Sequence, residues 1–152
     1  MSEAALSPAE SQNLLRIAGM MIPASQEYDI PGADEPRIFA DIVGSLGRDL
    51  GDVRTALAAL SALAGGSFAD LDAGQAASAL EQFMASGNAA SVILGRVILQ
   101  CYYRDDRVLR SLGLEARAPF PKGHTLEQGD WSLLDAVRTR PKLWRDDREV
   151  RR

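Results

Sequence analysis

The stretch YYRDDR brings together side chains that could act as an acid, a base and an anion clamp. Adjacent residues on a helix point about 100° apart, so these side chains cannot all converge on one substrate atom. At a corner between two helices an aspartate caps the second helix, a tyrosine fills the core, and the arginines pair with carboxylates. We therefore expect a structural corner. The catalytic alternative is a stand-alone enzyme with a cleft built from Tyr102 or Tyr103, Asp105 or Asp106, and Arg107.

Other patterns for cofactors and metals are missing from the sequence. A single cysteine, Cys101, excludes an internal disulfide and any CxxC motif, and a single histidine, His124, cannot supply a multi-histidine metal site. We expect the thiol to be buried and the histidine to lie in a surface loop. No GxGxxG motif follows a strand, and no GxxxxGK[ST] motif occurs. The sequence thus predicts a chain that binds no cofactor or metal itself.

Length and composition indicate one ordinary globular domain. The chain has 152 residues, of which 46% are hydrophobic and 25% charged, and this length is enough for a real core. The net charge is −4, with −6 on residues 1–114 and +2 on residues 115–152. This net acidity argues against nucleic acid as the main partner.

Neither a membrane span nor an export signal is visible. The opening MSEAALSPAESQ lacks a basic segment, a twin arginine and an apolar segment. No later stretch approaches the roughly 18 continuous apolar residues that a span needs. We therefore expect a cytoplasmic protein, which would reach the periplasm only if it were exported together with a partner.

Helix-capping patterns predict a series of helices up to Leu114. Ser7-Pro8-Ala9-Glu10 is a capping box that starts a helix ending near Ile22. The later helices are expected to start at Asp34, Asp52, Asp72 (a capping box with Gln75), Asn88, and Asp105 or Asp106, with stops at Gly65-Gly66 and Gly113. The apolar side chains expected to pack inward on these helices include Leu63, Val92 and Leu112.

The predicted fold is all-α, a single-domain bundle of five to six helices with a long irregular C-terminal arm. Residues 1–114 form the bundle. Residues 115–152 contain three prolines and both tryptophans, and show little helical periodicity beyond a turn at 131–138. Such an arm must pack on the bundle or on a partner, with Trp131 and Trp144 as large apolar anchors.

The order of several short motifs resembles the gluconate 2-dehydrogenase subunit 3 family over residues 10–114. Members of that family tend to show an IIP segment, a PGA loop and a late YY-x-D-x-x-V-x-x-x-x-G stretch. The matching residues are Ile22-Pro23, Pro31-Gly32-Ala33, Tyr102-Tyr103, Asp105, Val108 and Gly113.

The resemblance implies a non-catalytic small (gamma-type) subunit that binds and stabilises an FAD-dependent dehydrogenase of the glucose-methanol-choline (GMC) type. The FAD would then belong to the catalytic partner, and the two chains would form a hetero-oligomer. The residues expected to face this partner are Tyr102, Tyr103, Arg107, Phe120, Trp131 and Trp144. The alternative is a helical adaptor or regulator that binds an unrelated partner.

Overall fold

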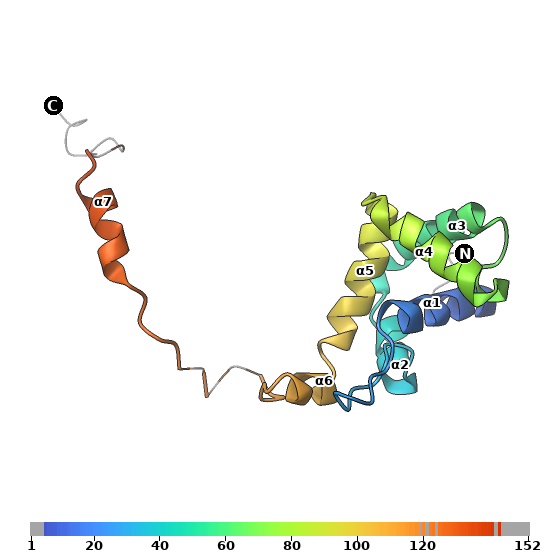
Figure 1. The fold of residues 1–152 in the computed structure, drawn as a ribbon, viewed down its shortest axis with the longest axis horizontal. Coiled ribbons are helices and arrows are strands. Elements are labelled where there is room, and N and C mark those ends of the chain that lie inside the picture. Colours follow the sequence, from blue (N-terminus) through green and yellow to red (C-terminus); the bar gives the residue numbers. More distant parts are fainter. Residues whose placement is uncertain (1–4, 119, 121, 124, 142, 144–152) are drawn as a thin grey trace. The chain divides into compact units, whose positions relative to one another are not determined.

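The structure, a computed structural model, describes residues 5–118, 120, 122–123, 125–141 and 143. These residues form helices and no strand, apart from an isolated bridge between Ser25 and Ile30. The α-helices in this part of the chain are α1 (Pro8–Met21), α2 (Pro36–Gly44), α3 (Leu50–Ala64), α4 (Ala73–Ala85), α5 (Ala89–Tyr102), α6 (Asp106–Ser111) and α7 (Asp135–Arg138). Three 3-10 helices accompany them: η1 (Gly47–Asp49), η2 (Phe68–Asp70) and η3 (Trp131–Leu134). The predicted all-α bundle is confirmed (Figure 1).

The chain divides into two compact units, Met1–Arg117 and Ala118–Arg152. The first unit contains α1 to α6, and the second contains η3 and α7. Every buried side chain among the described residues belongs to the first unit, and every described residue of the second unit is exposed. The described hydrophobic core is therefore the core of the first unit. No helix in the described part of the chain has the length and apolar character that a membrane span needs.

Local capping explains where most helices of the first unit begin. The capping boxes predicted at Ser7 and Asp72 are both present, and Asn88 caps α5 by accepting from the N–H of Ser91 at 2.9 Å. Asp105, rather than Asp106, caps α6. These caps satisfy N–H groups that the first turn of a helix leaves without a partner.

Two predicted helix starts were wrong. Glu35, and not Asp34, caps α2, because Pro36 occupies the first helical position and the preceding residue must be the cap. Glu35 accepts from the N–H groups two and three residues on, at 3.1 and 3.2 Å. Asp52 does not cap α3 but lies in its first turn, because η1 winds the chain into helix earlier, from Gly47.

The core of the first unit is built around α5, which packs against α2, α3 and α4 (Figure 1). Three apolar side chains predicted to face inward are exposed instead. Val92 lies one position off the buried stripe of α5, where a rotation of about 100° turns it outward. Leu63 is in the last turn of α3, and Leu112 follows the end of α6. The completely buried large side chains are Phe68, Leu14, Ile17, Ile38, Ile42, Leu60, Leu94, Ile98, Val53 and Val108.

Polar contacts fix α1 to η2 across more than fifty residues of sequence. The side-chain oxygen of Asn13 accepts from the N–H of Ala69 at 2.7 Å, and Arg16 donates to the carbonyls of Phe68 and Ala69 at 3.0 and 2.6 Å. The guanidinium of Arg16 also lies over the Phe68 ring, 5.6 Å from its centroid. Buried Phe68 is thus held by packing of its ring and by the hydrogen bond that Arg16 donates to its backbone carbonyl.

Candidate functional site

The two tyrosines at the corner between α5 and α6 have different environments. Tyr102 is buried, and its hydroxyl donates to the carbonyl of Pro31 at 3.1 Å. Burial raises the pKa of this phenol. Tyr103 is exposed, and its ring meets that of Tyr102 edge to face with centroids 5.4 Å apart. Tyr102 therefore anchors the loop before α2, while Tyr103 lies on the surface.

Arg107 is the centre of an ion-pair cluster that joins α6 to the start of α2. Its guanidinium donates to both carboxylate oxygens of Asp105, at 2.9 and 2.8 Å, and to Glu35 at 2.7 Å. Hydrogen bonding to Arg107 lowers the pKa of Asp105 to about 2 and also lowers the pKa of Glu35. Both carboxylates are consequently charged at neutral pH, and Asp105 is a poor proton acceptor.

Arg104 makes a second cluster on the other side of the corner. It donates to the carboxylate of Asp41 at 3.0 and 2.6 Å and to the hydroxyl of Ser45 at 2.7 Å. The same guanidinium lies 3.5 Å from the sulfur of Cys101. As predicted, this thiol is buried, and burial raises its pKa. The thiolate needed for nucleophilic chemistry is therefore disfavoured.

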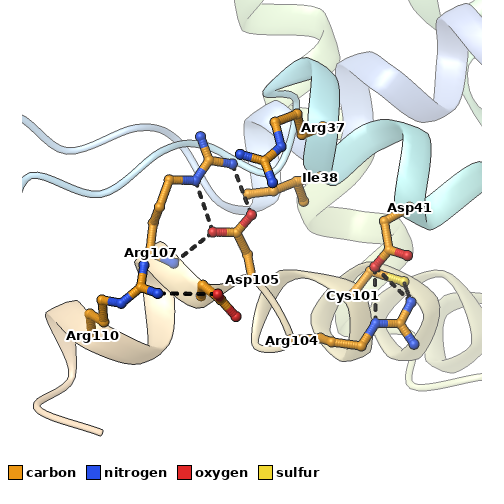
Figure 2. A pocket seen from close by; sticks show the side chains of 9 residues that line it. Arg37, Ile38, Asp41, Cys101, Arg104, Asp105, Arg107 and Arg110 are labelled. Carbon is orange, nitrogen blue, oxygen red and sulfur yellow. Dashed lines mark hydrogen bonds and ion pairs between the residues drawn. The ribbon is translucent and has the colours of Figure 1, made fainter. Parts of the chain in front are cut away.

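The two clusters line one pocket of about 400 Å³ (Figure 2). Its walls come from α2, the end of α5, the corner that follows it, and α6. Figure 2 shows the side chain of Arg37 extending from α2 toward Arg107. The lining residues are Arg37, Ile38, Asp41, Cys101, Arg104, Asp105, Asp106, Arg107 and Arg110. The pocket is thus rich in fixed charge, which suits it to bind a charged group.

A second hollow, of about 700 Å³, is lined by the loop at residues 24–31 and by α6. Arg107 and Arg110 line both hollows, so the two adjoin along α6. Tyr28 lines the second hollow, and its ring is largely exposed. The sequence interpretation named Arg107 but missed Tyr28, Arg37 and Arg110. The spacing of Arg107 and Arg110, three residues apart, was a signal for a basic surface on α6.

The second unit carries the other predicted partner-facing residues. Phe120 and Trp131 are 85% and 61% exposed, and the indole N–H of Trp131 donates to the side chain of Gln128 at 2.8 Å. Leu133 on η3 and Val137 on α7 are also exposed. Tyr102, Tyr103 and Arg107 therefore meet at one corner of the first unit, while Phe120 and Trp131 belong to the second. Trp144 and His124 lie outside the described residues.

No family model, curated protein or solved structure matches the chain. Among the described residues, no group of three or more histidine, cysteine, aspartate or glutamate side chains is arranged to hold a metal ion.

Proposed function

We propose that this chain is a non-catalytic small subunit that binds and stabilises an FAD-dependent dehydrogenase of the GMC type. The motif order at Ile22-Pro23, Pro31-Gly32-Ala33 and Tyr102-Tyr103 supports the identity of the partner. In this proposal FAD is held by the catalytic chain and the two proteins form a hetero-oligomer. Its compartment is the cytoplasm, or the periplasm if the two chains are exported together.

The observation that carries the proposal is the exposed apolar surface of the second unit. Its described large apolar side chains are all exposed: Phe120, Leu126, Trp131, Leu133, Leu134, Val137 and Leu143. Complete burial of one Leu, Val or Phe side chain contributes about 1.5–3 kcal/mol. A unit whose described residues include seven such side chains, none of them buried, gains this energy by packing on another surface. Aromatic side chains such as Trp131 are frequent hot spots of such interfaces.

Co-expression with a GMC-type FAD-dependent oxidoreductase from the same genome, chosen first where its gene neighbours the gene of this chain, tests the proposal. We expect the two proteins to co-purify, and the oxidoreductase to lose soluble yield or activity when this chain is omitted, because its apolar interface is then exposed. If the oxidoreductase neither retains this chain nor changes in yield or activity, the proposal is wrong. Stable binding to an unrelated protein instead would favour the adaptor.

A point substitution links the result to the second unit. We expect Trp131→Ala to weaken the complex by at least about tenfold, as loss of an aromatic hot spot does. Leu63→Ala is the matched control, because Leu63 is an exposed apolar side chain of the first unit. Equal affinities for the two variants would show that Trp131 is not part of the interface.

A further inference from the structure

The pocket in Figure 2 contains one arginine without a carboxylate partner. Four arginines and three aspartates line it. Arg104 pairs with Asp41, Arg107 with Asp105 and Glu35, and Arg110 with Asp106. None of the ion pairs within the described part of the chain includes Arg37. Its guanidinium is therefore available to a carboxylate from another molecule.

The neighbouring arginines differ in how firmly they are held. Arg107 makes hydrogen bonds to two carboxylates, which fix its guanidinium as a wall of the pocket. Arg110 has only an exposed pair with Asp106, in which both side chains are 63% exposed. Such pairs contribute about 0–1 kcal/mol, so Arg110 can change partner at little cost. The guanidinium groups of Arg37 and Arg110 are thus available to donate hydrogen bonds to a ligand, whereas the guanidinium of Arg107 is fixed by its two carboxylates.

Charge balance limits what the pocket accepts. Asp105 and Asp106 line it, and Glu35 holds Arg107 from outside the lining. A group with two negative charges, such as a phosphate, would be repelled by these carboxylates more strongly than a single carboxylate. A single carboxylate fits the one arginine that has no counter-ion, and arginine can bind it through two parallel hydrogen bonds.

The adjoining hollow indicates that this carboxylate belongs to a protein. The two hollows share Arg107 and Arg110 in their linings and have volumes of about 400 and 700 Å³. The second is lined by the exposed ring of Tyr28 and by Ile30 and Pro31. A charged pocket beside a partly apolar one suits a polypeptide segment that carries an acidic side chain next to an apolar one.

We propose that this paired hollow, defined by Arg37, Arg107, Arg110 and Tyr28, is a docking surface for an acidic segment of the partner protein, whose carboxylate binds Arg37. The inference rests on the proposed function and adds a second contact, on the first unit, to the apolar contact of the second unit. Arg37 is the anchor, and the surface around Tyr28 receives the neighbouring apolar side chain.

Charge reversal in the full-length complex tests this docking surface. In Arg37→Glu the new carboxylate repels that of the partner, so we expect the dissociation constant to rise at least about tenfold. The variant should fold, because a glutamate in the first turn of α2 is favourable at a helix N-terminus. Arg48→Glu is the matched control: its side chain is 90% exposed, does not line the pocket, and has only a 3.9 Å contact with Asp49.

Salt dependence provides the second measurement. In Arg37→Ala we expect weaker binding that depends less on NaCl than wild type, whereas Arg48→Ala should keep the wild-type salt dependence. If the complex forms and the Arg37 and Arg48 variants bind alike, the docking inference is overturned while the proposed function stands. If the wild-type chain forms no complex with the oxidoreductase, the proposed function is wrong and this inference falls with it.

Discussion

Replacing Arg107 with methionine removes the cation that joins α6 to the start of α2. The pKa of Asp105 falls from 3.8 to about 2 in the folded chain, mainly through its hydrogen bonds to Arg107. One pKa unit corresponds to about 1.4 kcal/mol, so the interaction is worth about 2.5 kcal/mol before solvent screening. Because the Arg107 side chain is 35% exposed, we reduce this to a loss of about 1–2 kcal/mol in the free energy of unfolding at pH 7.

The pH dependence follows from the direction of the two pKa shifts. Asp105 and Glu35 both have lowered pKa values in the folded chain, so folding favours their charged forms. Their stabilisation is complete above the pKa of the unfolded carboxylates and is lost as the pH falls through the folded value, about 2 for Asp105. The difference between wild type and Arg107→Met should therefore shrink between about pH 5 and pH 2.

Urea unfolding monitored by circular dichroism at several pH values measures this difference. Arg110→Met is the matched control on the same helix, and we expect it to stay within about 0.5 kcal/mol of wild type because its ion pair is exposed. A variant as stable as wild type at pH 7, or a stability difference that does not shrink as the pH is lowered, would refute the reasoning.

Three further perturbations address the core and the loops. Gly32→Ala should lower the free energy of unfolding by about 1–3 kcal/mol in a thermal melt, because its Cβ would lie 2.9 Å from a backbone nitrogen of the loop; Gly44→Ala, with open space around it, should not destabilise. Phe68→Ala should cost about 3–5 kcal/mol in urea unfolding because the ring is completely buried, whereas Phe120→Ala should change stability by less than about 0.5 kcal/mol. The Cys101 thiol should react with a thiol reagent at least about tenfold more slowly in the native chain than in urea, since it is buried and its pKa is raised. Equal rates in the two states would contradict the burial.

Helix starts could be predicted from the sequence because a cap is a local interaction. Ser7, Asp72 and Asn88 each accept from an N–H three residues on, so the sequence around them contains both partners. The start of α3 was missed because η1 begins the helical path before Asp52, with no side-chain cap to mark it. The inward face of α5 was only partly predicted, since one position decides whether Val92 points to the core or to solvent.

The candidate site could be predicted only in part, because its contacts join distant segments. The sequence marks the corner at Tyr102 and Tyr103 and the arginines that follow it. It does not show that Arg107 binds Glu35, 72 residues away, or that Tyr102 bonds to Pro31, 71 residues away. Arg37 could not be predicted from the sequence, because only the folded structure shows that it forms no ion pair with a described carboxylate.

The sequence by itself determined the helical class, most of the helix starts and the expectation that YYRDDR forms a structural corner, while the structure decided that Tyr102 is buried and Asp105 is the cap. Periodicity and capping act over three or four residues, so both can be recognised in the sequence without knowledge of the fold. Only the tertiary structure decided which arginines of the pocket are paired with described carboxylates and that Arg37 is not. Ion pairing depends on distances of a few ångström between side chains, and the packing of α5 against α2 and α3 sets those distances.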